Sequence, residues 1–223
     1  MKTITNRMFI LIIAITMIIC IVLGIISRMS ISTYQYEEVI KNADSYHFYL
    51  YENPEFANVF LYDYDLESID MLEESDYIIR GKITGKREVM QGTVKTEIEV
   101  VEEMKGSCRE SIIYVYEPID ITLNDSHMIL SYDGYNFLKE DREYILCLAK
   151  SAEEGAFLYV TPMFAKFPLN YSEDEFPILS FHESEERDVY YSEFVNAEQI
   201  FKTGEEKEFY FEHYQILISL EPS

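Results

Sequence analysis

An apolar segment near the N-terminus limits the arrangement of the whole chain. It runs from Met8 to Ser27 as MFILIIAITMIICIVLGIIS and contains no charged side chain. A helix with this number of residues spans about 30 Å, which is the thickness of the hydrocarbon core of a bilayer. The segment therefore predicts a single transmembrane helix at residues 8–27.

A cleaved signal peptide is the alternative interpretation of this segment. Its apolar region is usually only about 7–15 residues long and ends at a small-x-small cleavage site, and neither feature is found here. Cys20 lies in the middle of the run, and Ile18 and Ile19 occupy the positions where a lipoprotein signal has small residues. We therefore expect an uncleaved anchor.

The charges beside the segment predict its orientation. Lys2, Arg7 and the N-terminal amine precede it, whereas only Arg28 follows at once. Positive charge is enriched on the cytoplasmic side of membrane spans, so we expect the N-terminus inside the cell and the C-terminal domain outside the cytoplasm. The predicted parts are a cytoplasmic N-terminus (residues 1–7), the transmembrane helix (8–27), a juxtamembrane segment (28–58) and an acidic extracytoplasmic domain (59–223).

The charge of the tethered part excludes one class of partner. Of the 18 basic residues, three lie in the anchor region, so 15 remain against 41 acidic residues and the formal charge is near −26. Such a surface repels nucleic-acid phosphates. With 14 Phe and 19 Tyr, however, the chain can still bury a core. The expected partners are the membrane, through residues 8–27, and a protein.

Alternating apolar and polar residues predict a mainly β (α+β) fold with one or two short helices. One strand begins at Tyr77 and leads through a turn at Gln91-Gly92 to a second at Thr93–Val101. The other expected strands are Tyr46–Tyr51, Ile112–Tyr116, His127–Ser131, Glu143–Lys150, Ala156–Thr161 and an edge strand at Val189–Phe194. The expected helices are Tyr34–Ala43, Leu66–Glu74 with Asp65 as N-cap, and Glu205–Leu220 with Phe209, His213, Ile216, Leu217 and Leu220 on one side.

The period of two also predicts which side chains of the first hairpin point inward. The inward set is Ile79, Gly81, Ile83, Ile98 and Val100, and the exposed set is Lys82, Lys95, Glu97 and Glu99. So many short strands separated by polar turns are typical of a small antiparallel barrel.

One part of the chain resembles a known protein module. It begins with Glu74-Ser75-Asp76-Tyr77-Ile78-Ile79-Arg80-Gly81-Lys82-Ile83 and continues through a hairpin to Glu103-Met104-Lys105-Gly106. It resembles the opening of the OB-like barrel in tissue inhibitors of metalloproteinases and netrin-type modules. Uncharacterised anchored or secreted proteins of Gram-positive bacteria are similar too, with a later strand like Arg142-Glu143-Tyr144-Ile145-Leu146-Cys147-Leu148. The resemblance covers roughly residues 66–165 and implies an OB-like barrel.

The resemblance does not extend to protease inhibition. Those inhibitors chelate zinc through a cysteine at the mature N-terminus, and this chain has no such cysteine. Cys108 and Cys147 are the only cysteines outside the predicted span, and their sequence positions allow either a disulfide or two free thiols.

The sequence predicts no catalytic, cofactor-binding or metal-binding residue. Asp63, Asp65, Glu67 and Glu74 have the spacing of a calcium loop, but Ser68 occupies the position of the required glycine. His47, His127, His182 and His213 lie far apart along the chain. Acidic pairs in the loops, such as Glu153-Glu154, Glu173-Asp174-Glu175 and Glu185-Glu186, are typical of solvated loops. The tyrosine-rich runs at residues 46–51 and 62–64 either form a contact surface or cover the barrel.

The expected function is that of a non-catalytic, membrane-anchored domain that binds a protein partner at the cell envelope. Two alternatives remain open. One is an envelope hydrolase whose site is assembled in space, since catalytic triads need no sequence motif. The other is a cation-dependent element that binds the cell wall.

Overall fold

The computed structural model describes residues 9, 11–13, 15–17, 20, 36–51, 69–122, 127–179 and 188–220. The chain divides into two compact units, Met1–Tyr34 and Gln35–Ser223. Most of the predicted span at 8–27 lies outside the described residues. Within the described part, no helix has both the length and the apolar character that a membrane crossing requires. The transmembrane helix and its orientation stay predictions.

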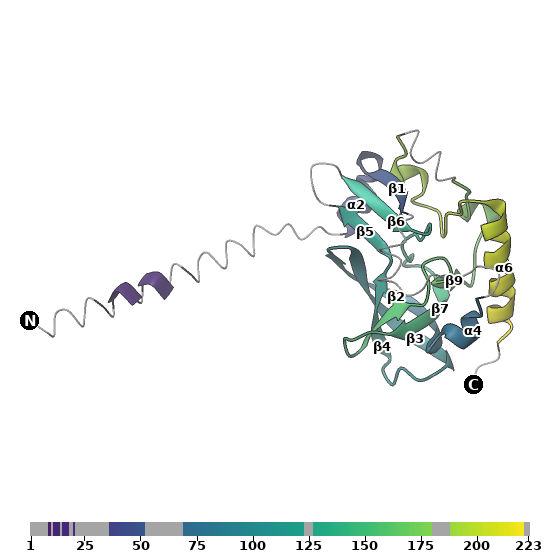
Figure 1. Ribbon diagram of the computed structural model, residues 1–223, viewed down its shortest axis with the longest axis horizontal. Coiled ribbons are helices and arrows are strands. Elements are labelled where there is room, and N and C mark those ends of the chain that lie inside the picture. Colours follow the sequence, from purple (N-terminus) through teal and green to yellow (C-terminus); the bar gives the residue numbers. More distant parts are fainter. Residues whose placement is uncertain are drawn as a thin grey trace, which may run out of the picture. The chain divides into compact units, whose positions relative to one another are not determined.

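The second unit is mainly β with few short helices, as predicted, and most of its strands belong to one sheet (Figure 1). The order in this sheet is β2-β3-β4-β8-β7-β9, and β2 also pairs with β7. All pairs are antiparallel except β4 with β8. The strands β2, β3, β4, β8 and β7 therefore each have a partner on both sides. Their bounds are β2 Tyr77–Met90, β3 Thr93–Lys105, β4 Ile112–Glu117, β7 Glu143–Lys150, β8 Ala156–Tyr159 and β9 Lys166–Pro168.

A second, three-stranded sheet lies at one end of this unit, with β1, β6 and β5 side by side (Figure 1). β1 (His47–Tyr51) pairs in parallel with β6 (Met128–Tyr132), and β6 pairs antiparallel with β5 (Ile119–Thr122). The sequence predicted β1 and β6 but not the short strands β5 and β9.

Two helices and one strand differ from the prediction. α2 (Tyr36–Lys41) ends at Lys41 rather than at the expected Ala43 and is followed by the 3₁₀ turn η1 (Ala43–Ser45). α4 (Met71–Glu74) begins at Met71, and its N-cap is Asp70 rather than Asp65, because the Asp70 carboxylate accepts the N–H groups of Leu72 and Glu73. The predicted edge strand at Val189–Phe194 is wrong, since this segment forms a single bridge at Tyr190 and the 3₁₀ turn η3 (Tyr191–Glu193). The helix predicted at Glu205–Leu220 is confirmed as α6 (Gly204–Ile218).

Strand β7 separates two hydrophobic clusters and is buried on both faces. Its residues Tyr144, Leu146 and Leu148 belong to the larger cluster, enclosed by the paired strands and the β1 sheet. Ile145 and Cys147 alternate with them and belong to the second cluster, which lies against α6. This explains why β7 is a nearly continuous apolar run, because neither of its faces is open to water.

The predicted inward residues of the first hairpin are mostly confirmed. Ile79, Ile83 and Ile98 are buried core residues, Gly81 is buried, and Val100 is half-buried. The predicted outward set is only partly confirmed. Glu99 is exposed and Lys82 half-buried, but Lys95 is largely covered and Glu97 is buried. The carboxylate of Glu97 accepts hydrogen bonds from three neighbours, the Thr84 hydroxyl, the Lys86 ammonium and the Tyr114 hydroxyl, which together cover it.

Candidate functional site

Helix α6 is held against the domain by two tyrosines. Its N-cap is Thr203, whose hydroxyl accepts the N–H of Glu206, which fixes the first turn. The hydroxyl of Tyr210 donates to the carbonyl of Lys166 at 2.8 Å, and that of Tyr214 donates to the carbonyl of Pro168 at 3.1 Å. Both acceptors belong to β9. The helix is therefore a fixed wall on the outer side of the sheet.

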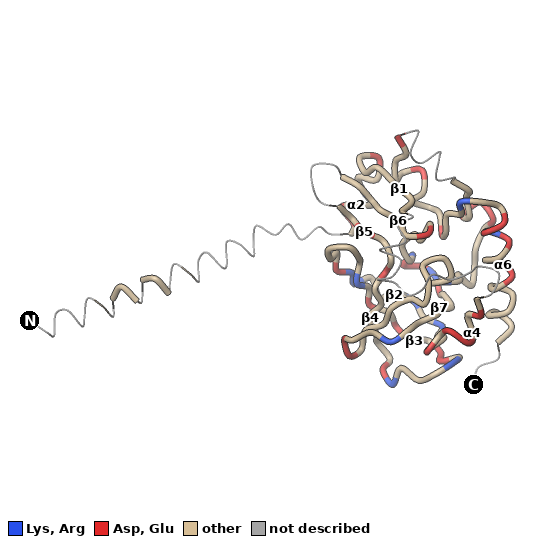
Figure 2. The backbone as a smooth tube through the Cα atoms, in the orientation of Figure 1, with Lys and Arg blue, Asp and Glu red and all other residues tan. Residues whose placement is uncertain are grey.

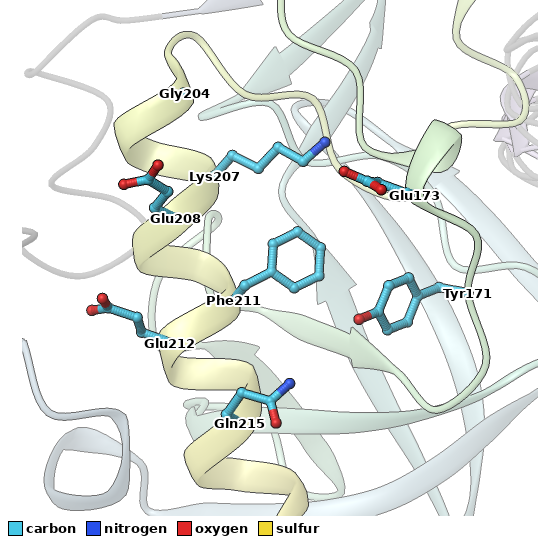
Figure 3. Close-up of a pocket in the computed structure, with 8 residues that line it drawn as sticks. All are labelled: Tyr171, Glu173, Gly204, Lys207, Glu208, Phe211, Glu212 and Gln215. Carbon is cyan, nitrogen blue, oxygen red and sulfur yellow. The ribbon is translucent and has the colours of Figure 1, made fainter.

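An open groove of about 780 Å³ runs between α6 and the segment that follows β9 (Figure 3). The lining residues of α6 recur every three or four positions, so they form one stripe of the helix. The opposite wall is Tyr171 and Glu173. The α6 stripe consists of Gly204, Lys207, Glu208, Phe211, Glu212 and Gln215.

Aromatic rings form the apolar part of this groove. Phe211 points toward Tyr171 in Figure 3, and their ring centroids are 5.6 Å apart. Behind them, Phe176 and Tyr214 lie 5.3 Å from Tyr171 in edge-to-face geometry. Tyr171 nevertheless keeps 40% of its surface exposed. The rings are thus fixed by packing and still accessible, which are the properties of an aromatic contact site.

The lining of the groove contains more negative than positive side chains. The ammonium of Lys207 donates to the carbonyl of Phe176 at 2.9 Å and extends toward the Glu173 wall (Figure 3). Glu208 and Glu212 lie one turn apart, are exposed and point outward from the helix. Among the described residues, no cation lies within ion-pair distance of either carboxylate. Figure 2 shows further acidic residues along α4 and α6, so this side of the domain attracts positive charge.

A buried cluster of charges lies elsewhere, around Glu198. This carboxylate is 3.1 Å from the ammonium of Lys166, 3.2 Å from that of Lys139 and 3.0 Å from the guanidinium of Arg142. Lys166 also donates to the carbonyl of Phe137. Because these contacts satisfy the groups internally, the cluster connects β7 and β9 with the segment before α6 and serves to hold the fold together.

The surroundings of the cluster lower the pKa values of two of its residues, Lys166 and Glu175. Burial lowers the pKa of Lys166, while the charge of Glu198 opposes this effect. For Glu175, burial alone would raise the pKa, but hydrogen bonds from Arg142 and from the backbone N–H of Ser172, together with the charge of Lys139, lower it to about 2. Glu175 is therefore ionised at neutral pH, and it stays bound to Arg142 as a structural ion pair.

A second buried ion pair lies inside the larger hydrophobic cluster. Nε of Arg87 is 3.4 Å from Glu117, and both side chains are almost fully buried. The Arg87 guanidinium lies 3.8 Å from the ring centroid of Tyr36 on α2. Glu117 also accepts hydrogen bonds from the Tyr135 hydroxyl and the Leu138 N–H. These groups bind one another and do not face the α6 groove.

Another open depression lies beside the Glu198 cluster and includes Lys139, Arg142 and Glu175 in its lining. Three of its charged residues are already paired with one another, since Glu175 accepts from Arg142 and lies 3.6 Å from Lys139. The α6 groove differs in its aromatic wall, where the exposed ring of Tyr171 contacts Phe211. Of the two, it is the better candidate for a contact with another molecule.

The histidines and acidic residues considered as ligands do not form a site in the described part of the chain. Within it, no three His, Cys, Asp or Glu side chains are grouped so that they can hold a metal ion. His47 and His127 are neighbours through their backbones, since the backbone N–H of His47 donates to the backbone carbonyl of His127. His213 lies on α6, where both ring nitrogens contact backbone carbonyls. His182, Asp63, Asp65, Glu67 and the pair Glu185-Glu186 lie outside the described residues.

The tyrosine-rich run at residues 46–51 contributes to the core as well as to the surface. Tyr46, Phe48 and Leu50 are buried, whereas Tyr49 and Tyr51 are half-buried. The run at 62–64 lies outside the described residues. Of the acidic loops, Glu153 forms an ion pair with Lys95 at 2.7 Å, and only Glu173 belongs to the groove.

The two cysteines whose pairing the sequence left open are both free. Cys147 is buried in β7 and Cys108 is half-buried. Burial raises the pKa of the Cys108 thiol to about 11 and that of Cys147 to about 12. Both thiols are thus protonated at neutral pH and are poor nucleophiles.

Comparison of the chain with protein-family models and with curated proteins finds no match. The groove itself was not predicted from the sequence, because Tyr171 and Phe211 come from distant segments. One signal was present: Tyr210, Phe211 and Tyr214 place rings on more than one side of α6. A helix that buries a single stripe needs aromatic residues on one side only, so the additional rings indicate a second contact face.

Proposed function

We propose that this chain is a non-catalytic, membrane-tethered domain that binds a protein partner outside the cytoplasm through the α6 groove. The observation that carries this proposal is the pair of accessible rings, Tyr171 and Phe211, held in place by Phe176 and Tyr214. Fixed, half-exposed aromatic side chains are typical anchors of protein interfaces. The polar residues around them resemble an interface rim.

The chemistry of the groove supports binding rather than catalysis. Its lining contains glutamates, a lysine and a glutamine, but no serine, cysteine or histidine among the described residues. The Lys207 ammonium is already occupied by the Phe176 carbonyl. A nucleophile with an adjacent base, which a hydrolase of this kind needs, is therefore missing from this lining.

The finer fold that we propose is an OB-like barrel. The pairings β2–β3, β3–β4, β4–β8, β8–β7 and β7–β2 support it, because they return to the strand from which they start. Five strands with Greek-key connections are typical of this fold. The similarity of residues 66–165 to netrin-type modules agrees with it at the level of fold only.

The proposed location rests on the apolar run at residues 8–27 and its flanking charges. It is tested by replacing the exposed Glu154 with cysteine and treating intact cells with a membrane-impermeant thiol reagent, with the native chain as background. We expect labelling before lysis. Labelling only after lysis would place the domain inside the cell.

The binding function is tested by capturing proteins from the native envelope with the full-length chain. Phe211→Ala and Tyr171→Ala should each abolish recovery of a specific protein, whereas Tyr114→Ala, on the exposed side of β4, should not. We expect a chelator to have no effect. Capture that survives both groove variants would contradict the proposed site, and loss with chelator would favour the cation-dependent alternative. Thermal melts of each variant exclude unfolding as the cause.

A further inference from the structure

The chemistry of the partner can be narrowed further, on the condition that the groove is the binding site proposed above. We infer that the partner packs an apolar side chain against the exposed surfaces of Tyr171 and Phe211 and places Lys or Arg side chains against Glu208 and Glu212. Such a segment is basic and amphipathic.

The first argument is that the outer edge of α6 has uncompensated negative charge. The helix contains four glutamates, Glu205, Glu206, Glu208 and Glu212, and one lysine. Glu206 forms an ion pair with Lys202 at 3.4 Å, and Lys207 is directed to Phe176. Glu208 and Glu212 therefore have no neutralising group among the described residues, and a partner's cations would supply one.

The second argument is that the rings favour the same partner. The faces of Tyr and Phe attract ammonium and guanidinium groups, and their apolar surface also accepts an aliphatic side chain. The distance between Glu208 and Glu212 is that of one helical turn, about 5–6 Å between Cβ atoms. Two basic side chains of one short segment can reach both carboxylates.

The third argument excludes other occupants on physical grounds. The net charge of −23 repels nucleic acids and anionic lipid headgroups. A metal ion needs several converging ligands, whereas Glu208 and Glu212 point outward and no group of three ligands exists in the described part of the chain. A basic peptide segment fits both the charge and the rings.

The absence of tryptophan from the chain allows a direct test. Phe211→Trp places a single tryptophan in the groove, and Tyr114→Trp places one on the exposed side of β4 as a control. The full-length chain in detergent micelles is titrated with a short, end-blocked peptide of alternating arginine and leucine. A second peptide replaces each arginine by citrulline, which has nearly the same shape but no charge.

We expect a saturable change in the fluorescence of the Phe211→Trp chain with the arginine peptide and none in the Tyr114→Trp chain. The citrulline peptide should bind about tenfold more weakly. Adding Glu208→Gln and Glu212→Gln should lower the affinity for the arginine peptide by about threefold to tenfold, since each exposed ion pair contributes little to binding. If Phe211→Trp does not fold, Gln215→Trp reports from the same groove.

Equal binding of the two peptides, or binding unaffected by the two glutamine substitutions, would overturn the inference. Failure of the inference and failure of the proposed function are distinguishable. If neither peptide binds but envelope capture still depends on Phe211, the proposed function stands and the basic partner is excluded. If capture is also insensitive to Phe211, the groove itself is not the site.

Discussion

The ammonium of Lys166 lies 3.1 Å from a carboxylate oxygen of Glu198, and both side chains are shielded almost completely from water. Glu198 also faces Lys139 and Arg142, so the two members of the pair are not equivalent. Loss of Lys166 leaves Glu198 with two cations. Loss of Glu198 leaves the Lys166 ammonium with a single hydrogen-bond acceptor, the carbonyl of Phe137.

We therefore expect Glu198→Ala to lower the free energy of unfolding by about 3–5 kcal/mol, the usual cost of leaving a buried charge unpaired. Lys166→Met should cost less, because its apolar stem is preserved. The double variant should cost less than Glu198→Ala alone. Urea unfolding of the four proteins checks this, and additive losses would show that the two residues do not interact.

Glu175 predicts a specific dependence of stability on pH. The pKa of Glu175 is about 2 in the folded chain, whereas the ordinary value for a glutamate, which applies to the unfolded chain, is 4.5. The folded state therefore binds this proton less readily than the unfolded state. The contribution of Glu175 is complete above pH 4.5 and is lost as the pH falls toward 2. Glu175→Gln should therefore be less stable than the native chain at pH 7, and the difference should shrink across this window. The exposed neighbour variant Asp174→Asn is the control, and a constant difference would contradict the assignment.

Ile98 tests the inward face of the first hairpin. It is completely buried and lies opposite Ile83 on β2 and Ile113 on β4. Ile98→Ala should cost about 2–5 kcal/mol in the free energy of unfolding. Val101→Ala, at a position that is 38% exposed on the same strand, should cost no more than about 0.5 kcal/mol. Similar costs at the two positions would mean that the strand register is wrong.

Two glycines with the same backbone conformation test a close contact between distant segments. Gly134 has φ +72° and Gly92 has φ +83°. A Cβ at Gly134 would lie 1.7 Å from the carbonyl oxygen of Ile200, whereas a Cβ at Gly92 meets no atom within 4 Å. Gly92→Ala should therefore cost about 1 kcal/mol, from backbone strain alone.

Gly134→Ala should cost more than Gly92→Ala, by about 2 kcal/mol or more, because the Gly134 and Ile200 segments must separate. The same separation would break the hydrogen bond from the Ile200 N–H to the Gly134 carbonyl. Thermal melts of both variants measure this difference. Equal losses would show that the close approach is not required.

The strands of the main sheet were predictable because their alternation is local. β7 was predicted with its observed bounds, Glu143–Lys150. The burial of Glu97 was not predictable, since it depends on Lys86 and Tyr114 from neighbouring strands. Short strands such as β9 have too few residues to show a period.

Helix α6 was predicted in its position but not in its buried face. Ile216 was placed on the apolar side of the helix and is 50% exposed, whereas Tyr210 is fully buried and Tyr214 nearly so. The two tyrosines can be buried because their hydroxyls have carbonyl acceptors on β9. Hydrophobic spacing alone does not contain that information.

The most direct test of the proposed function is site-specific photocrosslinking in intact cells. A benzophenone amino acid replaces Phe211 in the full-length chain, and the control replaces Tyr114, which is also exposed. The proposal predicts a discrete crosslinked protein from position 211 that is absent from position 114 and disappears when Tyr171→Ala is added. The same products from both positions, or none from position 211 while envelope capture still succeeds, would contradict binding through the α6 groove.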